Sequence, residues 1–78
     1  MAPIEMVAKF DQHGDPTPVR FKYNDQFIDV EQVLETSEEK LAANRMKIFS
    51  CQSEIGGALK RFELKFELAT CKWYLWKM

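Results

Sequence analysis

Few side chains of this protein are suited to catalysis. The chain has one histidine, His13, and two cysteines, Cys51 and Cys71. Nucleophilic catalysis needs a nucleophile with a base within hydrogen-bonding reach. The sequence contains no G-x-S-x-G, H-E-x-x-H or glycine-rich phosphate-binding motif. We therefore expect a non-enzymatic protein, and we interpret His13 as a solvated loop histidine.

The loop around this histidine has three potential metal ligands at alternate positions, Asp11, His13 and Asp15. Their spacing matches no calcium-binding loop, and a dedicated cation site normally has more oxygen ligands. A turn formed by Gly14, Asp15 and Pro16 explains the same residues. Structural zinc takes four Cys or His ligands, and the chain has three such residues in total. We predict no metal and no cofactor.

Cys51 and Cys71 both lie in predicted strands, and we interpret them as buried free thiols that act as small hydrophobic side chains. Cys51 is expected near Phe62 of the next strand. The sequence has no N-terminal apolar run and no stretch approaching the ~20 apolar residues of a membrane-spanning helix. These features predict a cytoplasmic protein without membrane contacts. In the cytoplasm, both thiols are expected to stay reduced.

The clearest structural signal is the alternation in KRFELKFEL, residues 60–68. Period two over this length is typical of a strand with one buried and one solvated face. The buried row would consist of Phe62, Leu64, Phe66 and Leu68. Residues 71–78, CKWYLWKM, would form the next strand if Ala69-Thr70 makes a tight turn.

That turn fixes a specific pairing between the two strands. On the buried face, the predicted pairs are Leu68 with Cys71, Phe66 with Trp73, and Leu64 with Leu75. On the charged face, they are Glu67 with Lys72, Lys65 with Tyr74, and Glu63 with Trp76.

Other segments predict four further strands and a loop. Residues 4–10 form a first strand, 11–18 a loop, and 19–30 a hairpin that turns at Asn24-Asp25. Residues 45–54 form a strand joined to the next by Ile55-Gly56-Gly57.

Residues 30–42 predict the only helix. Asp29 can cap its N-terminus, and Gln32 completes a variant capping box. Val33, Leu34 and Leu41 can share one face, while acidic residues gather toward the start as the helix dipole prefers. Ala42-Ala43-Asn44 would end it.

These elements predict a single domain, residues 1–78, of the α+β class. Short connections favour antiparallel pairing of neighbouring strands. We expect a curved antiparallel sheet of five or six strands that approaches a small open barrel, with one helix closing an end or packing on one face.

The charged face of the last two strands is the best candidate for a binding surface. The predicted patch consists of Arg61, Lys65, Lys72, Tyr74, Trp76 and Met78, which include residue types enriched at interface centres. We expect a protein-interaction or accessory module, with an unidentified protein or a second copy paired along residues 71–78 as its partner. The first strand or the helix could instead cover this face.

Single-stranded nucleic acid is the alternative ligand, because small barrels bind it through aromatic side chains flanked by basic ones. The net charge of −1 and the glutamates of the same face argue against it.

Six short motifs occur along the chain, namely Gly14-Asp-Pro16, Val19-Arg-Phe21, Val30-Glu-Gln-Val33-Leu34, Phe49-Ser-Cys51, Phe62-Glu-Leu64 and Trp73-Tyr-Leu75. This set resembles a group of small bacterial β-rich domains of unknown function, some of which are appended to larger proteins, including DNA-polymerase-like ones. The resemblance implies a bacterial source and a compact β-rich fold. It brings no catalytic motif, so it assigns no site residue.

Overall fold

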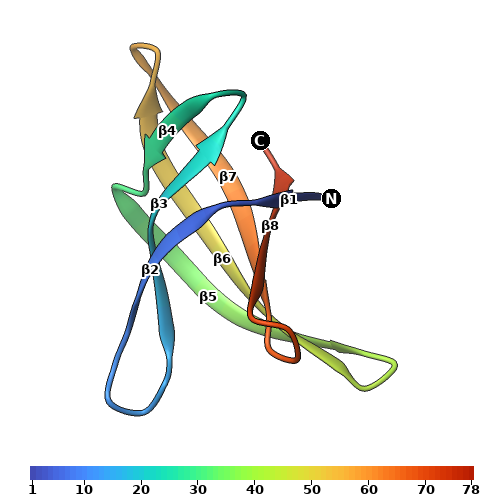
Figure 1. Ribbon diagram of the computed structural model, residues 1–78. Helices are drawn as coiled ribbons and strands as arrows, with labels where there is room; N and C mark the ends of the chain where they lie inside the picture. The colour runs from blue at the N-terminus through green and yellow to red at the C-terminus, as the bar shows by residue number, and fades with distance from the viewer.

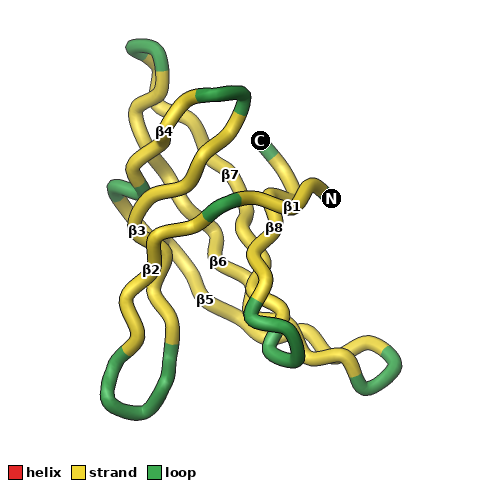
Figure 2. The backbone as a smooth tube through the Cα atoms, in the orientation of Figure 1, coloured by secondary structure: helices red, strands yellow, loops and turns green.

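The chain forms two antiparallel β-sheets and contains no helix (Figure 1, Figure 2). This computed structural model describes all residues from Met1 to Met78. The larger sheet has five strands, in the order β1 (Ala2–Ile4), β8 (Lys72–Lys77), β7 (Ala58–Glu67), β6 (Asn44–Ile55) and β5 (Gln32–Leu41). The smaller sheet has three strands, in the order β2 (Met6–Phe10), β3 (Pro16–Tyr23) and β4 (Gln26–Asp29).

Two predicted hairpins are confirmed, and both turn at residues suited to positive φ. Asn24 and Asp25 join β3 to β4 with φ of 50° and 59°. Gly56 and Gly57 join β6 to β7 with φ of 60° and 81°. Two-residue hairpins of this kind favour Asn, Asp and Gly, because those residues adopt positive φ at low cost.

The pairing predicted between β7 and β8 is confirmed over four residue pairs and wrong beyond them. Leu64, Lys65, Phe66 and Glu67 lie opposite Leu75, Tyr74, Trp73 and Lys72. Glu63, however, lies opposite Lys77, because a β-bulge makes Trp76 an extra residue in β8. The connection is also longer than Ala69-Thr70, since β7 ends at Glu67 and Cys71 lies in the turn with φ of 60°.

The helix predicted over residues 30–42 is wrong, since Gln32–Leu41 form strand β5. Its acidic side chains pair with basic ones on the larger sheet, Glu38 with Arg45 at 2.6 Å and Glu39 with Lys65 at 3.3 Å. The three apolar residues of the segment offer too narrow a stripe to hold a helix on a core. As an edge strand, β5 needs little apolar surface.

The α+β class is therefore wrong, and so is the expectation of one sheet that curves toward a barrel. The strands form two separate sheets instead, and the larger one ends in β1 and β5 while the smaller one ends in β2 and β4. Every strand pairing is antiparallel, as expected, but β1 and β2, and β4 and β5, are neighbours in sequence that belong to different sheets and do not pair. No helix of the chain could span a bilayer, because the chain forms none.

The N-terminal third also differs from expectation. The single strand predicted over residues 4–10 is divided at Glu5 into β1 and β2, which belong to different sheets. The loop predicted over residues 11–18 is shorter, because Pro16-Thr17-Pro18 begin β3. Strand β4 pairs only with Arg20–Tyr23, so the prolines lie where β3 has one open edge and proline is tolerated.

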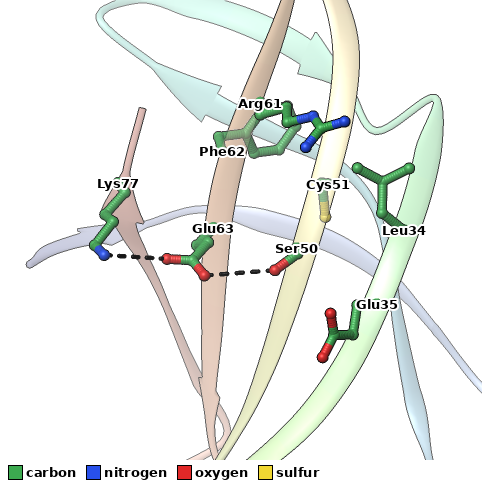
Figure 3. A pocket seen from close by; sticks show the side chains of 8 residues that line it. All are labelled: Leu34, Glu35, Ser50, Cys51, Arg61, Phe62, Glu63 and Lys77. Atoms are coloured by element: carbon green, nitrogen blue, oxygen red, sulfur yellow. Dashed lines mark hydrogen bonds and ion pairs between the residues drawn. The ribbon is translucent and has the colours of Figure 1, made fainter.

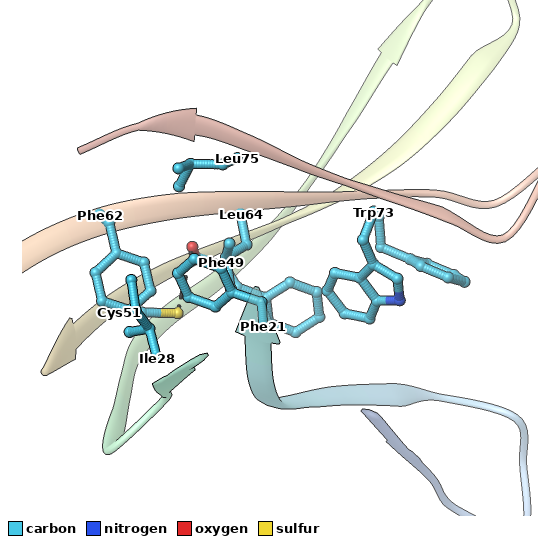
Figure 4. Close-up of a cluster of buried hydrophobic side chains, with 9 residues drawn as sticks. Phe21, Ile28, Phe49, Cys51, Phe62, Leu64, Trp73 and Leu75 are labelled. Carbon is cyan, nitrogen blue, oxygen red and sulfur yellow. Dashed lines mark hydrogen bonds between the residues drawn. The ribbon is translucent and has the colours of Figure 1, made fainter. Parts of the chain in front are cut away.

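The hydrophobic core lies between the two sheets (Figure 4). The smaller sheet contributes Phe21 and Ile28, and the larger sheet contributes Phe49, Cys51, Phe62, Leu64, Phe66, Trp73 and Leu75. The alternation in residues 60–68 thus predicted the buried side of β7 correctly, although Leu68 lies in the turn and is half-buried. Core rings pack in tilted pairs, such as Phe66 and Trp73 with centroids 4.8 Å apart.

Strand β8 is not an edge strand. Strand β1 pairs with it from Ala2 opposite Leu75 to Ile4 opposite Trp73, so the N-terminal residues lie beside the C-terminal strand. The chain ends accordingly lie close together in Figure 1. The free edge on which the predicted dimer through residues 71–78 depended is therefore occupied over those three residue pairs.

Candidate functional site

The larger sheet has one face against the core and one face without a covering layer. Along β7, the side chains of Phe62, Leu64 and Phe66 point into the core, and those of Arg61, Glu63 and Lys65 alternate with them. We call the second side the outer face. The smaller sheet lies behind the larger one when the outer face is viewed from the front (Figure 3).

One row of side chains crosses the outer face over four strands. Register places Glu35 of β5 opposite Ser50 of β6, Ser50 opposite Glu63 of β7, and Glu63 opposite Lys77 of β8. A β-bulge interrupts each end of this row, with Leu34 as the extra residue in β5 and Trp76 in β8. Bulges redirect side chains and often lie next to functional sites. The two bulges therefore make this row the distinctive part of the face.

The row lines a hollow of about 380 Å³. Its lining consists of Leu34, Glu35, Ser50, Cys51, Arg61, Phe62, Glu63 and Lys77 (Figure 3). Ser50 is the smallest member of the row, and it lies between two glutamates. Its short side chain leaves the space that a larger residue would fill.

Glu63 is the most unusual polar group of the hollow. Its Oε1 accepts a hydrogen bond from Ser50 Oγ at 3.4 Å. Its Oε2 is buried and accepts no hydrogen bond, and its nearest cation is Lys77 Nζ at 3.8 Å. Buried acceptors normally have a donor, because an unpaired one loses its hydration without replacement. Glu63 therefore keeps one carboxylate oxygen without a donor, on the side that faces Lys77.

Trp76 lies beside the hollow and is 39% exposed. Two ammonium groups lie against its ring, Lys65 Nζ at 3.8 Å and Lys77 Nζ at 4.4 Å from the ring centroid. Lys65 is only 6% exposed, and its charge is balanced by Glu39 at 3.3 Å. This cluster fixes the indole on the outer face through cation–π contacts.

The six residues of the predicted patch lie on or next to the last two strands, but they do not form one uniform surface. Arg61 lines the hollow, and Lys72 and Trp76 are exposed. Tyr74 is half-buried, Met78 is 48% exposed at the chain end, and Lys65 is buried beneath other side chains rather than free.

The other half of the site was not predicted from the sequence; it consists of Leu34, Glu35, Ser50, Glu63 and Lys77. Two of these belong to the segment predicted as a helix, and Lys77 reaches the row only because of the bulge at Trp76. Glu63 was placed on the correct face but opposite the wrong residue. Nothing in a single sequence marks a bulge between ordinary strand residues, so this half had no usable signal.

The residues considered for catalysis and metal binding lie elsewhere. Asp11 Oδ1 accepts backbone hydrogen bonds from His13 at 2.8 Å and Asp15 at 2.9 Å, which closes the β2–β3 loop as a turn. A hydrogen bond from Lys47 lowers the pKa of Asp15, whose carboxylate lies 2.9 Å from that ammonium. The oxygens of this loop are therefore used within the fold.

The two thiols differ sharply in environment. Cys51 is buried, as predicted, and lies opposite Phe62. Its burial raises the pKa of the thiol to about 12, so it stays protonated and unreactive at neutral pH. Cys71 is exposed in the β7–β8 turn, so its predicted burial is wrong.

Comparisons with known proteins add no assignment, since no family model, curated protein or solved structure matches the chain. The resemblance to small bacterial β-rich domains stays a prediction.

Proposed function

We propose that this chain is a non-enzymatic interaction module that binds a segment of a partner polypeptide on the outer face of the larger sheet. The observation that carries the proposal is the hollow of about 380 Å³ framed by two β-bulges, with Trp76 fixed and exposed beside it. Hollows of this size hold small ligands or individual side chains.

The composition of the face supports a polypeptide ligand. Exposed Trp and Arg side chains are enriched at the energetic centres of protein interfaces. The hollow also has one apolar wall, formed by Leu34, and two charged groups of each sign. Such a surface suits a chain with mixed side chains and backbone polar groups better than it suits a uniformly charged polymer.

The groups available in the hollow also favour binding over catalysis. The only thiol in the lining belongs to Cys51, and its raised pKa, about 12, leaves it protonated. The only histidine of the chain lies in the β2–β3 loop. The remaining groups are carboxylates, cations and the hydroxyl of Ser50, which can form hydrogen bonds and ion pairs with a ligand.

A phage-displayed library of random peptides, panned against the intact chain, tests this proposal. We expect enriched peptides that lose most of their binding to a Trp76→Ala variant. Phe27→Ala is the matched control, because Phe27 is 64% exposed on the other sheet. The proposal fails if no peptide is enriched, or if the enriched peptides bind the Trp76→Ala variant as well as the wild type.

Single-stranded nucleic acid is the second candidate ligand, favoured by the ammonium groups that flank Trp76. Lys65 is a poor phosphate ligand, however, because it is buried and paired with Glu39. Titration with oligothymidylate at low salt decides this candidate through Trp fluorescence. Binding should quench the indole and weaken steeply as salt is added, and an unchanged spectrum would eliminate nucleic acid.

A further inference from the structure

We infer that the partner polypeptide binds as an added antiparallel strand along the free edge of β5, between Glu35 and Leu41. This inference rests on the proposed function, because it states how the backbone of the partner is held. The starting observation is the topology of the larger sheet, in which β5 is an end strand that pairs only with β6. Of the four strands that end a sheet, β5 is the longest, with ten residues against three in β1, five in β2 and four in β4.

The backbone of β5 has a row of unused hydrogen-bonding groups along this edge. The two-residue turn after β5 makes Leu41 and Asn44 the hydrogen-bonded pair that closes the β5–β6 hairpin. Hydrogen-bonded and non-hydrogen-bonded pairs alternate in an antiparallel ladder, so every second residue before Leu41 points its N–H and C=O away from β6. These residues are Thr36, Glu38 and Lys40, and no backbone hydrogen bond outside the ladders involves them. An extended polypeptide is the ligand whose own backbone groups repeat at the same spacing.

The stretch from Glu35 to Leu41 is open to such a strand. It contains no proline and no bulge, the two devices that most often block an edge. All of its residues except the half-buried Glu39 are exposed. The bulge at Leu34 ends the regular edge at the point where β5 lines the hollow. A partner chain that leaves the edge there continues beside the outer face.

A second copy of this chain is a poor occupant of the edge. A two-fold symmetric antiparallel pair must be centred on a residue that lies opposite its own copy. Only centres at Ser37, Glu38 and Glu39 would pair five or more residues of the stretch 35–41. These registers place Glu35 opposite Glu39, Glu38 opposite itself, and Glu39 opposite itself, respectively. Like charges directly opposite each other are destabilising, so the edge suits a different polypeptide.

The charges of β5 that have no partner define the chemistry of that polypeptide. Glu35 and Lys40 form no ion pair, whereas the other two glutamates of β5 pair with cations of the sheet. An antiparallel strand would complement both with an acidic residue opposite Lys40 and, five positions later, a basic residue opposite Glu35. Leu41 is 66% exposed and favours an apolar residue opposite it. From its N-terminus, the expected segment is therefore one apolar residue, one acidic, four uncharged and one basic.

A fusion protein tests this inference with the full chain. The segment Val-Glu-Thr-Thr-Thr-Val-Lys follows Met78 through a linker of about 30 Gly and Ser residues. Such a linker has an r.m.s. span of about 30 Å, comparable with the longest dimension of the chain, 39 Å. Tethering raises the effective concentration of the segment to the millimolar range. The comparison fusion has Val-Lys-Thr-Thr-Thr-Val-Glu, which has the same composition and the two charges exchanged.

Amide hydrogen exchange followed by NMR gives the readout. Without a fused segment, the amides of Thr36, Glu38 and Lys40 should exchange quickly, while those of Ser37 and Glu39 are protected by β6. The designed segment should slow exchange of the first three amides about 10-fold. The charge-exchanged segment should slow it by no more than about twofold, because both opposite-charge pairs become like-charge pairs.

Thr36→Pro provides the matched variant on the side of β5. The N–H that proline removes points away from β6, so the β5–β6 ladder is kept while the edge is blocked. In the designed fusion, this variant should restore fast exchange of the Glu38 and Lys40 amides. Continued protection of Ser37 and Glu39 in the same spectrum shows that the variant is folded.

The results separate this inference from the proposed function. Equal protection by the two segments, or none by either, refutes the added strand. Protection of the Thr36, Glu38 and Lys40 amides in the unfused chain also refutes it, and a dependence of that protection on protein concentration would assign the edge to a second copy. Library peptides that depend on Trp76 but bind the Thr36→Pro variant as well as the wild type refute the added strand while the interaction surface stands. Failure of the library selection alone refutes the proposed function.

Discussion

The turn between β5 and β6 gives the sharpest test of the fold, because its sequence does not match its conformation. Ala42 and Ala43 form a two-residue hairpin turn with φ of 49° and 67°. Such turns favour Asn-Gly, since positive φ brings the Cβ of an L-residue close to its own backbone. We predict that the double substitution Ala42→Asn, Ala43→Gly stabilises the protein.

The size of the effect follows from two opposing terms. Left-handed backbone costs an L-residue such as alanine roughly 1–2 kcal/mol, and glycine avoids this cost. A new glycine also increases the conformational freedom of the unfolded chain, which removes about 0.4–1 kcal/mol of stability. Asparagine at position 42 adds a smaller gain, because it adopts positive φ more readily than alanine. The net expectation is about 1 kcal/mol.

Thermal unfolding followed by circular dichroism measures this change. A gain of about 1 kcal/mol should raise the Tm by roughly 4–8 °C for a domain of this size. The hairpin tip projects away from the rest of the molecule (Figure 1), so the substitution alters few other contacts. Ala69→Gly is the control, because Ala69 lies exposed in another turn without positive φ, and it should lower the Tm.

A decrease of the Tm on substitution of Ala42 and Ala43 would contradict a positive φ at these residues. If Ala43 did not have a positive φ, the new glycine would only add conformational freedom to the unfolded chain and would lower the stability by about 0.4–1 kcal/mol. A fall of the Tm with the double substitution would therefore contradict the hairpin. A rise with Ala69→Gly as well would show that glycine stabilises turns of this chain for another reason.

Three further predictions concern the buried and titratable groups. Ellman's reagent should modify Cys71 quickly in the native protein and Cys51 only on unfolding, and two fast thiols would contradict the burial of Cys51. Ser53→Ala should lower the free energy of unfolding by about 1–3 kcal/mol, because it removes the hydrogen bonds of the Ser53 hydroxyl with the backbone of Asp29 and Glu31. Urea unfolding measures this loss, and the exposed Ser37→Ala should change the free energy of unfolding little. Hydrogen bonds from a threonine hydroxyl and then an asparagine amide lower the pKa of Glu67 below its ordinary 4.5. A lowered folded-state pKa stabilises the folded protein at pH values above 4.5, and this stabilisation is lost as the pH falls through the folded-state pKa of Glu67. Glu67→Gln should therefore flatten the acid branch of the stability–pH curve, and an unchanged branch would exclude this contribution.

The strands that could be predicted best from the sequence are those with one buried face and one solvated face. The alternation of residues 60–68 gave the buried row of β7, and the turn residues at 24–25 and 56–57 gave two hairpins. These signals are local, because side-chain period and turn preference are properties of a few neighbouring residues. These local signals do not depend on which other segment the strand packs against.

Strand β5 was missed because its stability comes from other segments. Residues 32–41 alone have acidic side chains and few apolar ones, which a helix tolerates as well as a strand does. The strand forms because β6 provides a partner for its backbone hydrogen bonds from Gln32 to Leu41, and cations of β6 and β7 pair with Glu38 and Glu39. A β-hairpin at Ala42-Ala43 was unforeseen for the same reason, since nothing in those two residues favours a turn. Long-range pairing decided this segment against its local preference.

The bulge at Trp76 links the difference in register to the site. Without the extra residue, strict alternation would place Trp76 opposite Glu63 and would turn Lys77 toward the core side. With it, Trp76 and Lys77 both lie on the outer face, and Lys77 Nζ approaches Glu63 Oε2 to only 3.8 Å. The lysine is then close enough to balance the charge of Glu63 and too far to donate a hydrogen bond. One inserted residue therefore leaves the charge of Glu63 balanced by Lys77, while one of its carboxylate oxygens accepts no hydrogen bond.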